Sequence, residues 1–339
     1  MRRGARFVAK KYGVAFAALA LFVVGCGGGG SGTTGSGAAE TSGGSGSISI
    51  SGSSTVEPIS ARVAQAFDAA NGTATTVEGP GTGDGFAKFC AGETDISDAS
   101  RSIKDSEAED CTAAGVEYVE LHIATDGITV MTNPSNEAVS CLTFGDLYAL
   151  TGPESEGFGT WSAADGLAAE VGGTGGFPDA DLYVVGPGEE SGTYDTYVEL
   201  VIEALAEERG AETASRADYE ASTNDNVIVQ GVEQNPTSLA WVGFAFYEEN
   251  RDKVRAIAID DGESGCVDPT NDTIASFEYP LSRPLFIYVN TSDLSGQTQD
   301  FVDYYLSDEG IAFVSEAGYV QLPAAELEET RAAWEAAKG

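Results

Sequence analysis

The sequence predicts an α/β protein with two domains, each built on a mainly parallel sheet. From residue 47 onward, short apolar segments rich in β-branched residues alternate with segments of helical periodicity. The chain has 339 residues, a length typical of about two domains. Hydrophobic residues make up 42% of the chain and charged residues 21%, which is enough apolar material for folded cores.

The first half of the alternation is delimited by clear helix signals. Pro58 favours the first turn of a helix, and Asn71-Gly72 favours its end. We expect strands at 47–50, 73–77, 116–123 and 128–132, and helices at 58–70, 84–91 and 143–150.

The second half continues the same alternation. We expect strands at 182–185, 239–242, 254–259 and 285–289, and helices at 192–208, 295–306, 308–317 and 325–338. The segment 227–232 is weaker, and helix and strand both remain open for it.

Residues 1–25 have the composition of a signal peptide. Five basic residues and no acid precede a run of 13 uncharged residues, 12–24, and this run is too short to span a bilayer. The run ends in Val23-Val24-Gly25-Cys26, which resembles the bacterial lipobox and implies a lipid anchor at Cys26. An ordinary signal peptide or a membrane anchor with an incidental cysteine is the alternative.

After the signal peptide we expect the lipidated Cys26 and then a flexible tether up to residue 46. Half of residues 27–46 are glycine, which is typical of a flexible linker. Without residues 1–25 the chain keeps 12 basic and 54 acidic residues, a formal charge of −42. Such acidity argues against nucleic-acid binding. The single histidine, His122, excludes most histidine metal sites and makes any Ser-His-Asp triad depend on that residue.

Four cysteines remain after Cys26, and an even number outside the cytoplasm favours disulfides. We predict Cys90–Cys111, around a loop after the helix at 84–91, and therefore Cys141–Cys266. A four-thiolate metal site is the alternative, although close C-x-x-C pairs are absent from the sequence.

Three loops combine glycines and hydroxyls at the start of an expected helix. They are Ser51–Val56, Gly79–Gly85 and Ser191–Thr193. Helix N-termini carry unpaired N–H groups and the positive end of the dipole, and glycines let a ligand approach the backbone. Each loop alone is more simply an ordinary N-cap, but three together indicate an oxyanion site.

A fourth segment, Asp95-Ile-Ser-Asp-Ala-Ser-Arg101, adds a cation. The guanidinium of Arg101 has a planar fork that matches phosphate oxygens. A surface arginine among acids is the alternative.

In their order along the chain, the four segments together with Asp126-Gly127 resemble the phosphate-binding proteins of bacterial ABC importers over residues 47 to about 318. The resemblance implies a two-domain periplasmic-binding-protein type II fold with hinge crossings and the anion in a cleft. It implies domain one at 47–126 and 284–339 and domain two at 127–283. The implied phosphate-binding residues are Ser54, Thr55, Val56, Thr82, Gly83, Asp98, Ser100, Arg101, Ser191, Gly192 and Thr193.

Two departures from the family pattern affect the expected site. Pro187 stands where some members have an arginine, so Arg101 is expected to be the only strong cation. Asp84 stands where glycine is frequent, and we expect it to point outward. Asp98 is our candidate acceptor for the phosphate proton, which sulfate lacks.

The expected activity is capture of inorganic phosphate and delivery to the membrane subunits of an ABC importer, by a monomer that needs no metal or cofactor and is not an enzyme. Another oxyanion, sulfate or molybdate, is the first alternative. A secreted phosphate-ester hydrolase is the second, but no base for Ser191 is identifiable, because His122 lies in an apolar strand. A surface adhesion or signalling protein is the third.

Overall fold

A nine-stranded sheet of mixed pairing runs through the part of the chain that this computed structural model describes, residues 47–338. Its strand order is β2-β1-β3-β12-β4-β8-β6-β7, with β9 beside β4, and β11-β10-β5 form a second sheet. The strands are β1 (Ser47–Gly52), β2 (Ala74–Glu78), β3 (Ile96–Ala99), β4 (Tyr118–Thr132), β5 (Cys141–Thr143), β6 (Tyr183–Pro187), β7 (Glu220–Ser222), β8 (Ser238–Gly243), β9 (Arg255–Ala256), β10 (Ala258–Asp260), β11 (Cys266–Val267) and β12 (Ser282–Asn290).

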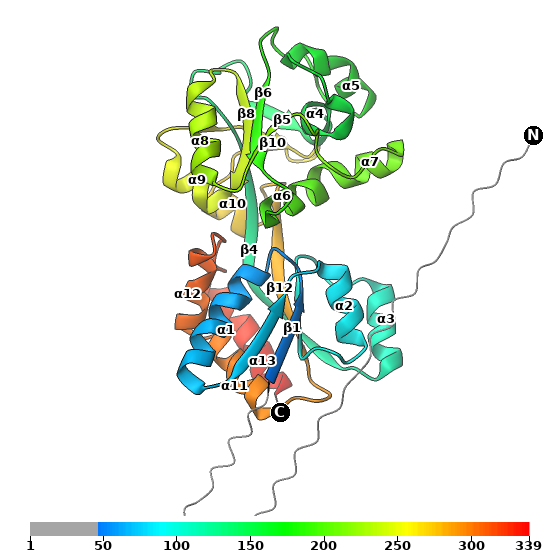
Figure 1. Ribbon diagram of the computed structural model, residues 1–339, viewed down its shortest axis with the longest axis vertical. Coiled ribbons are helices and arrows are strands. Elements are labelled where there is room, and N and C mark those ends of the chain that lie inside the picture. Colours follow the sequence, from blue (N-terminus) through cyan, green and yellow to red (C-terminus); the bar gives the residue numbers. More distant parts are fainter. Residues whose placement is uncertain (1–46, 339) are drawn as a thin grey trace, which may run out of the picture. The chain divides into compact units, whose positions relative to one another are not determined.

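Helices pack against this sheet along the chain (Figure 1). They are α1 (Glu57–Asn71), α2 (Thr82–Cys90), α3 (Asp105–Ala114), α4 (Phe144–Thr151), α5 (Asp165–Glu170), α6 (Gly192–Tyr197), α7 (Glu203–Arg209), α8 (Asp225–Gln234), α9 (Phe244–Asn250), α10 (Asn271–Ala275), α11 (Gly296–Tyr305), α12 (Asp308–Glu316) and α13 (Ala324–Ala337). A π-helical segment, η3 (Val198–Ile202), joins α6 to α7, so the predicted helix at 192–208 is confirmed as one helical run.

The expected α/β fold is confirmed, and its strand pairing is mixed. The pairs β1–β2, β1–β3, β6–β8 and β6–β7 are parallel, as expected. The long strands β4 and β12 instead pair antiparallel with each other and with their neighbours β3 and β8. The sequence predicted two separate sheets, but the pairing of β4 with β12 joins them into one continuous sheet.

Most predicted elements are confirmed, and helix α1 begins and ends where its signals indicate. Gly72 ends it in the left-handed conformation, with φ of 68°. The ambiguous segment at 227–232 is helix α8. The strand expected at 254–259 is divided between β9 and β10, which belong to different sheets.

The two strands predicted at 116–123 and 128–132 are one strand, β4, and that prediction was wrong. Asp126-Gly127 does not interrupt the strand, because Gly127 pairs with Ser282 and Asp126 with Arg283 across to β12. A side chain at Gly127 would meet Ile274, whose Cδ1 lies 2.8 Å from an ideal Cβ position. The glycine therefore serves close packing rather than a turn.

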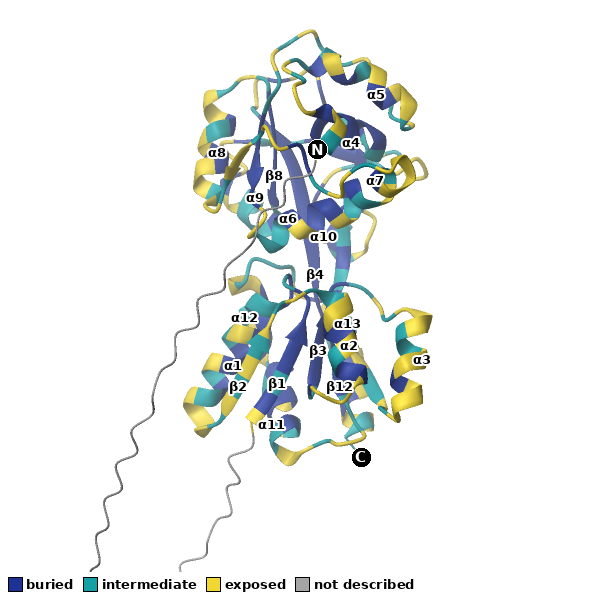
Figure 2. Cartoon of the chain, turned by 45° about the vertical axis from the view of Figure 1, so that its right-hand side comes forward, coloured by how far each residue is buried: buried dark blue, intermediate teal, exposed yellow. Residues whose placement is uncertain are grey.

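Two large groups of buried apolar residues lie on the sheet, where Figure 2 shows the strands buried and the outer helix faces exposed. One core takes its buried residues from 48–124 and 285–334, and the other from 128–281. The paired strands β4 and β12 run from one group to the other (Figure 1).

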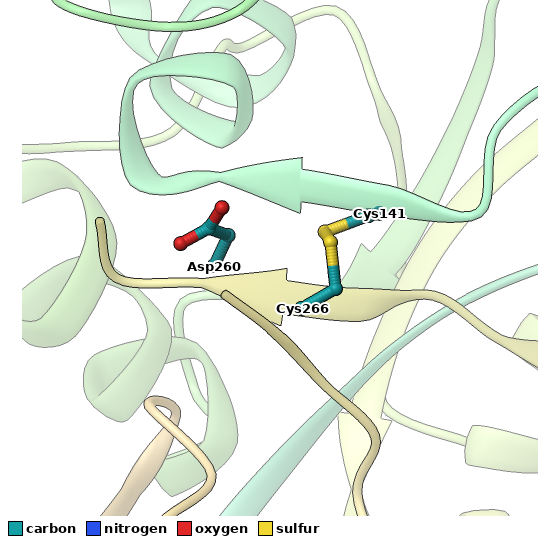
Figure 3. A group of neighbouring side chains, drawn as sticks. All are labelled: Cys141, Asp260 and Cys266. Carbon is teal, nitrogen blue, oxygen red and sulfur yellow. A yellow bond between two sulfur atoms is a disulfide. The ribbon is translucent and has the colours of Figure 1, made fainter. Parts of the chain in front are cut away.

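Both predicted disulfides are present, Cys90–Cys111 and Cys141–Cys266. Cys111 lies in helix α3, which the sequence analysis expected as a loop. Figure 3 shows Cys141–Cys266 beside Asp260, the one group of three neighbouring metal-ligand side chains within residues 47–338. Because the four cysteines are paired, the four-thiolate alternative is excluded.

The predicted signal peptide, Cys26 and the tether lie outside the described residues. Among residues 47–338, no helix has the length and apolar character that crossing a bilayer requires.

Candidate functional site

A cavity of about 570 Å³ collects residues from the predicted loops. It is lined by Ser53, Ser54, Thr55, Pro80, Gly81, Thr82, Gly83, Ser100, Arg101, Lys104, Tyr194, Asp195, Val198, Glu199, Glu203, Thr213 and Arg283. Six of the eleven predicted phosphate-binding residues are therefore side by side: Ser54, Thr55, Thr82, Gly83, Ser100 and Arg101.

The first loop is held rigidly at the end of β1. Gly52 approaches Asp98 so closely that an added Cβ would lie 2.0 Å from its carbonyl oxygen, and Ser53 N donates to the same oxygen at 2.8 Å. Inside the loop, Ser53 Oγ accepts from Thr55 N at 3.2 Å. The Val56 amide donates to the Ser53 carbonyl at 3.2 Å, and Val56 does not line the cavity. The hydroxyls of Ser54 and Thr55 are the donors that this loop places at the start of α1.

The second loop begins helix α2 beside the first. Gly81 has φ of 112°, a conformation that residues with a side chain rarely adopt, and its amide donates to the Gly52 carbonyl at 2.8 Å. Thr82 Oγ1 lies 3.0 Å from Ser100 Oγ and accepts from Ser100 N at 3.2 Å. The second loop and the fourth segment therefore form one hydrogen-bonded wall.

Arg101 is oriented by a carboxylate of the next helix. Its two terminal nitrogens donate to the two carboxylate oxygens of Glu107, each at 2.8 Å, and its guanidinium carbon lies 5.6 Å from the centre of the Phe86 ring. The hydrogen bonds that Arg101 donates to Glu107 raise the pKa of Arg101. Burial alone would raise the pKa of Glu107, but the hydrogen bonds from Arg101 and from the Lys104 amide outweigh it and lower that pKa.

Asp98 is fully buried directly beneath the first loop. Its Oδ1 accepts from Ser60 Oγ at 2.9 Å, and Oδ2 has no hydrogen-bond partner among the described residues. Burial raises the pKa of Asp98 to about 7, with Glu57 adding to the rise and Ser60 opposing it. Asp98 does not itself line the cavity, although Ser100 and Arg101 do.

The third loop contacts the first but contributes to the cavity through the residues that follow it. Ser191 caps α6 and accepts from Thr193 N at 3.2 Å. An ideal Cβ on Gly192 would lie 3.4 Å from the Ser54 carbonyl oxygen. The cavity lining from this helical run is Tyr194, Asp195, Val198, Glu199 and Glu203, and not the three predicted residues.

Arg283 is a site residue that the sequence analysis missed, and the expectation of Arg101 as the only strong cation was wrong. Arg283 is 5% exposed and lies 3.4 Å from Asp126. It donates to Thr55 Oγ1 at 2.8 Å and also bonds Thr196 and Glu199. Its signal in the sequence was a charge at the start of an apolar strand, Ser282-Arg283-Pro284.

The ion pair Arg283–Asp126 connects β12 to β4 at the level of the cavity. Burial raises the pKa of Asp126, and the charge and hydrogen bonds of Arg283 and Thr196 partly offset that rise. Asp84 is exposed, as expected.

His122 does not lie at the cavity. It lies in β4, stacked against Phe277 with ring centres 6.1 Å apart, and burial lowers its pKa. The cavity therefore offers no histidine to activate Ser191, which argues against the hydrolase alternative.

Hydroxyl groups and two arginines meet at one cavity of an α/β fold with two cores, an arrangement suited to binding a small polar ligand. A family model described as a PBP superfamily domain matches residues 37–309, and the chain therefore belongs to the PBP superfamily.

The similar proteins align with most of this chain. Protein SphX of Synechocystis sp. is 40% identical over 277 residues, covering 80% of this chain and 77% of SphX. The phosphate-binding protein PstS of Staphylococcus saprophyticus is 35% identical, covering 80% of this chain and 79% of PstS. A crystal structure titled as a "possible phosphate binding protein" from Planctomyces limnophilus superposes with a TM-score of 0.79 at 37% identity, over 87% of this chain and 99% of that one.

Proposed function

We propose that the protein binds inorganic phosphate outside the cell and delivers it to an ABC-type import permease. The relatives named PstS support the ligand class. The observation that carries the proposal is the cavity, where Ser54, Thr55, Thr82, Ser100 and Arg101 converge from three separate segments.

The donors are suited to an oxyanion held without a metal. Hydroxyls of the three segments and the amides of Thr82 and Gly83 at the start of α2 supply neutral hydrogen bonds, and Arg101 and Arg283 supply charge. About ten hydrogen bonds, each contributing roughly 0.5–1.5 kcal/mol, are enough for the roughly −8 kcal/mol of a micromolar ligand.

Asp98 remains our proposed acceptor of the phosphate proton. Its Oδ2 is buried with no hydrogen-bond partner among residues 47–338, and its backbone carbonyl accepts from Ser53 N in the loop that carries Ser54 and Thr55. Because its pKa is raised to about 7, Asp98 is ionised and can accept above neutral pH. Sulfate has no proton to offer, so the preference for phosphate should weaken as Asp98 gains a proton at lower pH.

We further propose domains at 47–126 with 284–339 and at 127–283, joined by hinge crossings in β4 and β12. The division of the two cores supports these bounds. The third loop already contacts the first loop in this structure, so in this proposal opening of the domains would carry Ser191, Gly192 and Thr193 away from the anion and release it. In this proposal the protein is a monomer that captures and does not catalyse, anchored to the membrane through a lipid on Cys26.

Thermal unfolding with added anions tests the function. A ligand with a Kd of about 1 μM stabilises the folded protein by about 4 kcal/mol when present at 1 mM. We expect that stabilisation from phosphate and much less from sulfate or molybdate at the same concentration. Equal stabilisation by all three anions would favour the general-oxyanion alternative, and none from phosphate would refute the proposal.

A further inference from the structure

Two carboxylates project into the cavity from one face of the helical run that follows the third loop. Asp195 lies in α6 and Glu199 in η3, four residues apart, and both line the cavity. Residues at this spacing share a helix face. An anion site in a protein of such negative charge thus has acidic side chains in its own wall.

Each carboxylate holds a donor from another part of the fold. Asp195 Oδ2 accepts from Ser54 Oγ at 2.7 Å, across 141 residues of sequence. Glu199 Oε2 forms an ion pair with Nη1 of Arg283. Both donors line the same cavity, so the chain supplies its own anions to groups that would also bind an oxyanion.

Arg283 is held by several partners, whereas both carboxylates are exposed. Arg283 has a side chain 6% exposed, and Thr55, Thr196 and Asp126 hold its other nitrogens. The Glu199 side chain is 39% exposed, and Asp195 is also exposed. Either carboxylate can therefore turn into solvent, whereas Arg283 is held in place and cannot follow Glu199.

We propose that Asp195 and Glu199 are intramolecular competitors of phosphate, which occupy Ser54 and Arg283 and thereby set the affinity. The inference rests on the proposed function. When a site is competent for only a fraction of the time, the apparent Kd rises by the inverse of that fraction. A ligand must therefore displace both carboxylates. This requirement favours an anion with several oxygens, which can accept hydrogen bonds from several donors at once.

The chain offers a matched control in Glu203. It lines the same cavity one turn beyond Glu199, and it makes no hydrogen bond or ion pair to a side chain within residues 47–338. Glu203→Gln removes the same charge from the same wall without releasing a donor. Its effect measures the general electrostatic contribution alone.

Isothermal titration of phosphate into the purified wild-type protein and the variants Asp195→Asn, Glu199→Gln and Glu203→Gln tests the proposal. We expect Glu199→Gln to tighten phosphate binding about fivefold, because a charged partner of Arg283 becomes a neutral one. Asp195→Asn should tighten it about threefold. Glu203→Gln should have less than half the effect of Glu199→Gln.

The outcomes separate this inference from the function on which it rests. Weaker binding in Asp195→Asn or Glu199→Gln would show that the carboxylates are themselves phosphate ligands and overturn the inference. Unchanged affinity in both, or equal tightening in Glu203→Gln, would overturn it as well. In each of these cases wild-type binding remains intact, whereas a wild-type protein that does not bind phosphate would refute the proposed function itself.

Discussion

Replacing Asp98 by Asn should make the protein more stable at high pH than the wild type. The folded protein holds this carboxyl at a pKa of about 7, against its ordinary value of 3.8. Between these values the folded state keeps a proton that the unfolded state has lost, so wild-type stability falls as pH rises through this range and the loss is complete above about 7. The difference corresponds to about 4 kcal/mol.

Urea unfolding in phosphate-free buffer at pH 4 and pH 8 measures this effect. Because Asn does not titrate, the stability of Asp98→Asn relative to the wild type should increase by about 4 kcal/mol between the two pH values. The exposed Asp84→Asn serves as the control, with a change of less than about 0.5 kcal/mol. If the difference in unfolding free energy between Asp98→Asn and the wild type were the same at both pH values, the argument that burial raises the pKa of Asp98 would be refuted.

Three further predictions concern the ligand, the surface charge and the N-terminus. Arg101→Ala should weaken phosphate binding about tenfold or more, because a charge-assisted donor is lost; unchanged affinity in a titration would place the site elsewhere. The melting temperature should rise from low salt to 1 M salt, because salt screens the −42 charge; a salt-independent value would contradict this. Mass spectrometry of the mature protein should find a lipid on an N-terminal Cys26, and an unmodified or uncleaved N-terminus would exclude the anchor.

Local signals predicted the parts of the site that depend on neighbours in sequence. Pro58 and Gly72 delimit α1, and glycines and hydroxyls at the starts of α1 and α2 line the cavity. Each of these features is decided within a few residues, by a cap, a turn or a helix start. Such features can be recognised without knowledge of the fold.

The parts that sequence reasoning missed depend on strand pairing. β4 continues through Asp126-Gly127 only because β12 pairs with it along the whole crossing. The same pairing brings Arg283 opposite Asp126, and so to the cavity. The residues around Arg283 do not indicate that it pairs with Asp126, because Asp126 lies 157 residues away in the sequence.

Isothermal titration of the purified protein with phosphate and with sulfate tests the central claim most directly. We predict a phosphate Kd in the micromolar range or tighter, near −8 kcal/mol or below, with a clear preference over sulfate. Phosphate binding weaker than millimolar, or equal affinity for sulfate, would contradict the assignment of this cavity as a phosphate site.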